Sequence, residues 1–327
     1  MQEGNESEKE SFKFSERRQV IQITFNAIFV LLTITGNSLI CAAYHLNKTI
    51  RTPSNAIVLS MAYCDLLMVL SFVFKITSAL CEGSIRTYVC MVYSSFGYII
   101  TSLIIFHLCA ISIDRLLAVK YSLRYNSMVS RARVSRCLIG IWMFGLFQIA
   151  MIPVVLKSSK IRSTLDTTID PCMAFWTRPA NKNTTWDNLS TKFKVFLICI
   201  LIFVFLLPIL IIVISYCYIW KQAMNHVKQI KAQKRALNKR PDEKYFQIHL
   251  KSTQTFAIVI GIFLVCFLPV FAVMCERILF FTTVTEAEAS LVLMLAHTSV
   301  IWNPFIYAWR NRVFRKAVKR LIASRRR

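Results

Sequence analysis

The chain has 327 residues, of which 56% are hydrophobic, and its formal net charge is +24. A soluble domain could not cover so apolar a composition with polar surface, so a membrane protein is the expected class. The positive charges avoid the apolar stretches and gather in particular loops, which membrane topology explains more economically than nucleic-acid binding. We therefore expect no nucleic-acid partner.

Seven stretches are long and apolar enough to span a bilayer as helices. They cover residues 20–44, 54–80, 89–113, 134–155, 195–220, 253–274 and 287–309. Residues 1–19 are polar and are expected to form an extracellular tail. Residues 310–327 are basic, with apolar side chains at helical spacing, which predicts a short amphipathic helix on the inner membrane surface. The predicted fold is an all-α membrane protein, a seven-transmembrane helix bundle.

The charges of the loops give an orientation. Lys and Arg gather after the first, third and fifth spans and in the tail, whereas most acids lie on the other side. The positive-inside rule then places the N-terminus outside a plasma membrane and the C-terminus in the cytoplasm, with membrane lipids around the bundle. N-glycosylation sequons at Asn5, Asn183 and Asn188 fall on the predicted outer side.

Polar residues and prolines within the spans need a compensating reason. Asp65 lies in the middle of the second span, where it is either a functional carboxylate or a protonated acid bonded to another helix. Asp114 and Arg115 close the third span, either as a functional pair or as an anchor at the membrane edge. Asn303 and Pro304 interrupt the last span, which costs backbone hydrogen bonds.

In order and spacing, these motifs resemble the rhodopsin-like G-protein-coupled receptors, from about residue 20 to 321. The resemblance implies that an extracellular ligand, a small molecule, signals to heterotrimeric G proteins through a cytoplasmic cavity. It implies no enzyme activity and no cofactor, and no zinc-ligand spacing, nucleophile elbow or Gly-rich phosphate loop is present. The alternatives are a receptor-like protein that binds ligand without signalling, or a transporter, although the repeated halves of a transporter are not apparent.

The resemblance assigns switch and G-protein-coupling roles to one set of residues. They are Asp65, Asp114, Arg115, Ile105, Pro208, Tyr216, Phe263, Asn303, Pro304 and Tyr307. Three positions depart from the family pattern: Leu116 replaces a tyrosine, Phe267 a tryptophan, and His249 the acid that would restrain Arg115 from the sixth span. The last departure leads to the hypothesis of raised basal activity.

In the family, the acid that Asp65 matches holds a sodium ion. Here Ile104 and Val300 stand where polar groups are usual, so the sodium site is left open. Cys90 and Cys172 match the family's disulfide between the third helix and the second outer loop. The sequence does not decide whether two further outer cysteines, Cys81 and Cys275, pair.

Candidate ligand-binding residues lie in the outer third of the bundle. They are Lys75, Gly97, Tyr98, Thr101, Ala174, Phe267, Val270, Met274 and His297. Gly97 replaces the aspartate of amine receptors, and His297 replaces the lysine that holds retinal in visual pigments. Lys75 either meets an acidic or phosphate-bearing ligand or extends to the outer interface.

Residues 113–126 and 297–310 look most like adenosine receptors. His297 matches a ribose-contacting histidine of that group. Met274 and Ala174, however, stand where those receptors carry the asparagine and phenylalanine that hold the purine base. Because buried polar recognition carries much of such specificity, the likeness indicates a shared scaffold and not a shared ligand.

Overall fold

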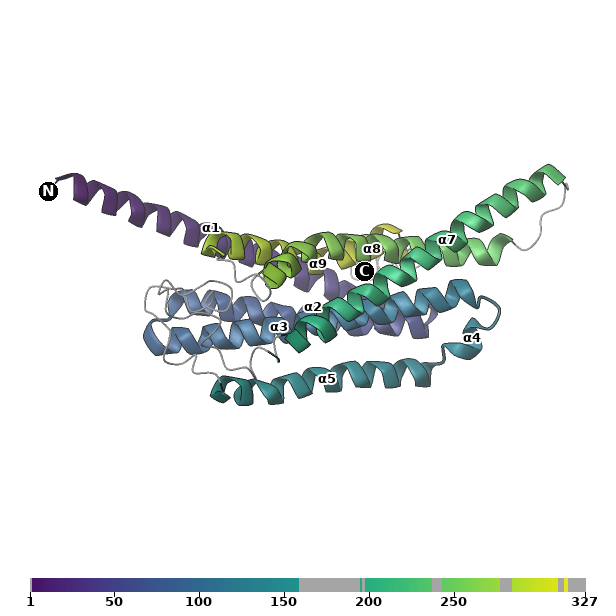
Figure 1. Cartoon of the computed structure of the whole chain (residues 1–327), viewed down its shortest axis with the longest axis horizontal. Helices are drawn as coiled ribbons and strands as arrows, with labels where there is room; N and C mark the ends of the chain where they lie inside the picture. The colour runs from purple at the N-terminus through teal and green to yellow at the C-terminus, as the bar shows by residue number, and fades with distance from the viewer. Residues whose placement is uncertain are drawn as a thin grey trace, which may run out of the picture.

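The computed structural model describes residues 2–158, 195, 198–236, 243–276, 284–310 and 315–316. Within these ranges, seven helices are long and apolar enough to cross a membrane. They belong to α1 (Gln2–Leu46), α2 (Pro53–Leu80), α3 (Gly83–Lys120), α5 (Arg131–Ser158), α7 (Leu207–Ala236), α8 (Glu243–Cys275) and α9 (Glu286–Arg310) (Figure 1). The predicted seven-helix bundle is confirmed. Apart from Arg315 and Lys316, the expected amphipathic helix after residue 310 lies outside the described residues.

The helix α3 is the centre of the bundle. It contacts α2, α5, α7 and α8, while α1 packs against α2 and α9. Its side chains Leu103, Ile104 and Ile105 are almost completely buried. Figure 1 shows the helices running lengthwise, with the start of α1 projecting at one end and α7 and α8 projecting at the other, beside α4 (Tyr125–Met128). We call this second end the α4 end.

Two helices, α2 and α9, begin with residues whose side chains cap the first turn. Thr52 precedes α2, its hydroxyl accepts a hydrogen bond from the Asn55 amide at 3.3 Å, and Pro53 occupies the first turn. Before α9, the Glu288 amide donates to the Thr285 hydroxyl at 3.2 Å, and the Thr285 amide donates back to the Glu288 carboxylate at 2.9 Å. This reciprocal pair is a capping box, which satisfies amides that a helix start leaves free.

Several helices are longer than their predicted spans. The third was predicted over residues 89–113, but α3 runs from Gly83 to Lys120, because the charges of Asp114 and Arg115 compensate each other and need not end the helix. The helix α1 begins at Gln2, so residues 2–19 are helical and continue into the first span. The helices α7 and α8 also extend past their spans, α7 to Ala236 and α8 from Glu243.

The fifth span carries a local change of helix type. A π-helical segment, η4 (Leu201–Leu206), precedes α7, and Pro208 follows directly at the start of α7. Proline lacks an amide hydrogen, and its ring collides with the carbonyl group four residues earlier in an α-helix. The wider π turns relieve this conflict, so the fifth span accommodates Pro208 with a π segment.

A buried chain of hydrogen bonds joins α2, α3 and α5. The Trp142 indole donates to the Ser60 hydroxyl at 2.9 Å, and that hydroxyl lies 2.8 Å from Nε2 of His107. The other ring nitrogen of His107 lies 2.7 Å from the Leu103 carbonyl oxygen, so it carries the proton and Nε2 accepts from Ser60. Polar links of this kind hold helices together where lipid supplies no hydrophobic driving force.

Candidate functional site

A cluster of polar side chains lies at the α4 end, around Asp114 of α3. The Arg115 side chain forms an ion pair with Asp114, with Nε donating to Oδ2 at 2.9 Å. The Tyr125 hydroxyl donates to the other oxygen of Asp114 at 2.6 Å. Ser54, at the start of α2, lies 3.2 Å from the same oxygen and 2.6 Å from the Tyr125 hydroxyl. The cluster therefore joins α2, α3 and α4.

The cluster around Asp114 is largely buried. Asp114 and Arg115 are each only 5% exposed, although they lie near the end of the bundle. Burial, and then the negative charge of Asp114, raise the pKa of Tyr125 to about 12. The Tyr125 hydroxyl thus stays protonated at physiological pH and remains a donor to Asp114.

A second polar contact lies deep in the bundle, between α2 and α9. Asp65 is completely buried, and the Asn303 amide donates to its Oδ2 at 2.9 Å. Its other oxygen, Oδ1, has no hydrogen-bond partner among the described residues. Hard cations need several oxygen ligands, and Ile104 and Val300 supply none at the two positions that the resemblance singles out. Two of the positions that would hold the family's sodium ion therefore lack a side-chain oxygen here.

The packing of α1 on α9 depends on the absence of one side chain. A Cβ atom added at Gly36 would lie 2.5 Å from Cγ of Pro304. Pro304 is buried within α9, next to Asn303. Gly36 therefore lets the two helices approach closely where α9 carries its asparagine–proline pair.

The predicted switch residues between the two ends contribute to one buried core. On α8, the rings of Phe263 and Phe267 stack with centroids 4.4 Å apart, and Ile105 of α3 is fully buried in the same hydrophobic cluster. The Tyr216 hydroxyl is buried and has no partner among the described residues. The side chain of Tyr307 lies outside what the structure describes.

At the opposite end, the structure brings three of the candidate ligand-contacting helices together around Lys75. The Lys75 ammonium lies 5.7 Å from the centroid of the Tyr93 ring on α3. It is also close enough to His297 of α9 to interact with it electrostatically. The His297 ring in turn lies edge-on to Phe72, with centroids 4.9 Å apart.

The other candidate ligand residues differ in how far they are buried and in which helix they face. Phe267, Val270 and Met274 are buried along α8, and Thr101 is half-buried on α3. Gly97 has open space beside it, since an added Cβ would meet only Ser71, at 4.0 Å. The Tyr98 hydroxyl accepts a hydrogen bond from Gln148 at 3.3 Å, so it is directed toward α5. Ala174 lies outside the described residues.

The cysteines at the outer end behave differently from one another. Cys90 is disulfide-bonded, and its predicted partner Cys172 lies outside the described residues. Cys81 and Cys275 are free thiols. The side chains of the three predicted glycosylation sites, Asn5, Asn183 and Asn188, are also outside the described part of the chain.

Sequence reasoning missed two members of the cluster at the α4 end. Tyr125 was part of the stretch that resembles adenosine receptors, but no role was predicted for it, and Ser54 was taken only as the start of a span. A useful signal is the short distance along the chain, since a tyrosine placed one short turn after Lys120 lies within reach of Asp114. Ser54 gives no comparable signal, because its contact depends on how α2 packs against α3.

Comparison with known proteins agrees with this arrangement. The human adenosine receptor A2b is 26% identical over 323 residues, covering 94% of this chain and 91% of the receptor. The human adenosine receptor A2a is 28% identical, with 93% and 72% covered, and the dog histamine H2 receptor is 30% identical, with 91% and 78% covered. Residues 36–307 match the family model of the seven-transmembrane receptors of the rhodopsin family, so the chain belongs to this non-enzymatic family.

Proposed function

We propose that this chain transmits the binding of an extracellular small molecule to heterotrimeric G proteins by opening a cavity at the α4 end. One observation supports this above all: Arg115 is buried at that end beside Asp114 and Tyr125. A displacement of the neighbouring helices would expose its guanidinium group to a partner. A ligand that binds the open bundle more tightly than the closed one shifts the existing equilibrium toward the open form.

The helix α8 is suited to carry this displacement. Pro269 lies inside α8 and removes one backbone hydrogen bond, which makes a hinge there. The stacked Phe263 and Phe267 lie within two turns of that hinge, in the core that includes Ile105. Rotation at Pro269 would therefore move the packed rings and the cytoplasmic arm of α8 together.

The chemistry of the outer end favours an anionic ligand. Lys75 places a positive charge beside Tyr93 and His297, between α2, α3 and α9. The relatives are named as receptors for adenosine and histamine, but two substitutions argue against both ligands here. Met274 lacks the polar atoms that would recognise a purine edge, and Gly97 lacks the charge that would pair with an amine.

The test is G-protein activation in cells that express the chain, measured without ligand and with purines, amines, acidic metabolites and peptides. We expect an acidic compound to activate, and Arg115→Ala to abolish the signal at equal surface expression. Lys75→Gln should raise the half-maximal concentration of that compound about tenfold, the cost of losing one charge-assisted hydrogen bond. Signal that survives Arg115→Ala would contradict the proposed coupling route, and silence despite surface expression would favour the non-signalling alternative.

A further inference from the structure

Three side chains with metal-binding atoms meet on the lipid-facing surface where α1 packs against α2. Nε2 of His45, in the last turn of α1, lies 2.7 Å from the Tyr63 hydroxyl of α2. Cys41 precedes His45 by four residues, so both occupy one face of α1. Tyr63 is also close enough to Cys41 to interact with it electrostatically. A sulfur, a nitrogen and an oxygen atom from two helices are thus brought together.

The exposure of these three side chains is unusual for their position. Tyr63 is 38% exposed, His45 is exposed and Cys41 is partly exposed. All three belong to segments that are long and apolar enough to cross the membrane. Ionisable side chains within such segments are rare and indicate a function by default. Their grouping on a surface that faces lipid therefore needs an explanation other than core packing.

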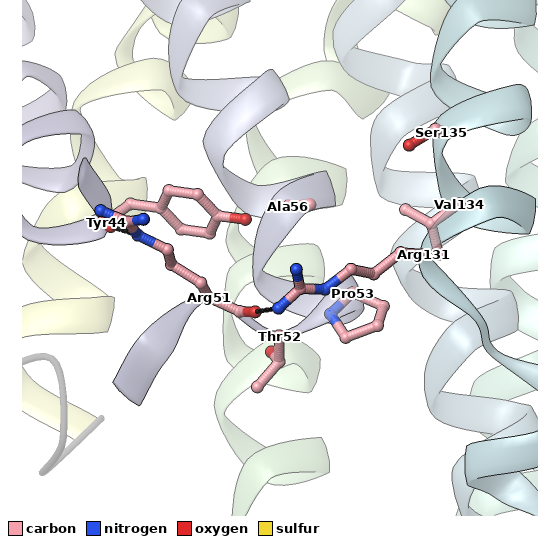
Figure 2. A pocket seen from close by; sticks show the side chains of 8 residues that line it. All are labelled: Tyr44, Arg51, Thr52, Pro53, Ala56, Arg131, Val134 and Ser135. Atoms are coloured by element: carbon pink, nitrogen blue, oxygen red, sulfur yellow. Dashed lines mark hydrogen bonds between the residues drawn. The ribbon is translucent and has the colours of Figure 1, made fainter. Parts of the chain in front are cut away.

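The end of α1 that carries His45 is held in a fixed position. Nε of Arg51 donates to the Tyr44 carbonyl at 3.2 Å, and a second Arg51 nitrogen donates to the His45 carbonyl. Figure 2 shows the Arg51 side chain reaching back to Tyr44 at the end of α1. The Tyr44 ring stands edge-on to the His45 ring, with centroids 5.8 Å apart. The imidazole is thus positioned before a ligand binds, which lowers the entropic cost of binding.

The three atoms suit a zinc ion. Zinc prefers thiolate sulfur and imidazole nitrogen, and many of its tetrahedral sites combine three protein ligands with one water molecule. Two ligands four residues apart on one helix face are a recurring pair in zinc sites. Nitrogen and oxygen ligands about 2.1 Å from a tetrahedral zinc lie about 3.4 Å apart. The 2.7 Å contact between His45 and Tyr63 would therefore need to open by less than about 1 Å to admit the ion.

The composition of this group excludes other metals and explains why the sequence does not reveal it. Magnesium and calcium need several oxygen ligands, and the group offers only the Tyr63 hydroxyl. Within the described residues, no three His, Cys, Asp or Glu side chains gather around one point, so a phenol has to supply the third ligand. Cys41 and His45 alone are too short a pattern to mark a zinc site, because that third ligand comes from α2.

We propose that Cys41, His45 and Tyr63 bind a zinc ion between the last turn of α1 and α2. The Cys41 thiol gives up its proton to water as the ion binds, and a water molecule fills the fourth position. The end of α1 lies at the α4 end, which the loop charges predict to face the cytoplasm. The ion would therefore enter from the cytoplasmic side, and it would link α1 to α2.

The test uses the full chain, purified in detergent and stripped of metal with a chelator. Zinc is titrated in competition with a coloured zinc indicator, and cobalt serves as a spectroscopic substitute, because a thiolate bound to cobalt gives a charge-transfer band. We expect one high-affinity zinc ion per chain. Cys41→Ser should remove the cobalt–thiolate band, and both Cys41→Ser and His45→Gln should weaken zinc binding at least about tenfold. Tyr63→Phe should weaken it about tenfold, and excess magnesium should not compete.

The matched control is Cys217→Ser, which removes an exposed thiol of α7 with no histidine four residues before or after it. It should change neither the zinc affinity nor the cobalt band. If a variant of the site fails to fold, the unmodified chain provides a second test. Zinc should slow the alkylation of Cys41 by N-ethylmaleimide more than that of Cys217, measured by mass spectrometry of the digested protein.

Three results would overturn the proposal. Zinc affinity that Cys41→Ser and His45→Gln leave unchanged would place the ion elsewhere in the chain. An equal loss of affinity in Cys217→Ser would indicate binding to exposed thiols in general. Alkylation of Cys41 that zinc does not slow would show that its thiol is not a ligand.

Discussion

Tyr125 contributes its hydroxyl group to the cluster around Asp114. It donates to Asp114 at 2.6 Å, while Asp114 holds Arg115. This contact does not depend on a carboxylate from the sixth span, where the sequence has His249. The restraint on Arg115 therefore comes in part from α4, a short turn that follows the span.

We predict that Tyr125→Phe raises basal G-protein activation. The substitution keeps the ring but removes one donor from a buried carboxylate, which is worth about 1.5–3 kcal/mol, or roughly tenfold or more in the equilibrium. Activation would be measured without ligand at matched surface expression. Tyr121→Phe is the control, because Tyr121 is exposed in the same loop. Equal basal activity of all three proteins would show that the Tyr125 hydroxyl does not restrain Arg115.

Asp65 and Asn303 form the second pair whose chemistry is testable. We predict that Asn303→Ala lowers the free energy of unfolding by about 1–3 kcal/mol, since it leaves a fully buried carboxyl group without its 2.9 Å donor. The reciprocal double variant Asp65→Asn with Asn303→Asp keeps one carboxyl and one amide, and it should recover part of the loss. Thermal melting of the purified receptor would measure both, and a double variant less stable than Asn303→Ala would contradict a direct contact.

The resemblance to the receptor family assigned roles to Asp65, Asn303, Asp114 and Arg115. In the structure Asn303 contacts Asp65, and Arg115 contacts Asp114. Charged and polar groups inside a span are rare and costly, so they stand out in a sequence. The residues that bond to Asp114 do not stand out in the sequence, because Ser54 and Tyr125 are common residue types near a helix end. Their contacts depend on the packing of α2 against α3 and on the turn that forms α4.

Among the elements, apolar length predicted the seven helices, with both ends of α2 and α9 within one residue, but it missed the extensions of α1, α3, α7 and α8. The long helix α3 continues past Asp114 because the ion pair with Arg115, which a hydropathy profile does not contain, compensates its charges. At Pro208 the sequence shows the missing amide hydrogen, but it does not show that the turns before this proline become π-helical. Helix starts with Thr52 and Thr285 follow capping rules that residue types do reveal.

The contact between α1 and α9 provides a test at the element scale. We predict that Gly36→Ala lowers the free energy of unfolding by about 1–3 kcal/mol, because the new methyl group would overlap the rigid Pro304 ring. Gly140→Ala is the matched control in another helix, where an added Cβ meets nothing within 4 Å. That control should be neutral or stabilising by about 0.5–1 kcal/mol. Thermal melting that shows the same loss for both would contradict the close packing.

For the whole molecule, the charge asymmetry makes a prediction about topology. We expect glycans at Asn5, Asn183 and Asn188, because all three sequons lie on the side with fewer Lys and Arg. Digestion with peptide-N-glycosidase should lower the apparent mass of the expressed receptor, and replacing the three asparagines with Gln should abolish that change. A fourth sequon, Asn47-Lys48-Thr49, lies on the side predicted to face the cytoplasm. Glycosylation there instead would indicate the opposite orientation.

We propose that this receptor activates G proteins through the arginine held at the α4 end. The most direct measurement is nucleotide exchange on a purified heterotrimeric G protein, with the purified receptor in lipid nanodiscs and without ligand. We predict that the receptor accelerates exchange, that Tyr125→Phe accelerates it further, and that Arg115→Ala returns it to the rate of the G protein alone. Exchange that Arg115→Ala leaves unchanged, in a variant that melts at the same temperature as the unmodified receptor, would contradict the claim.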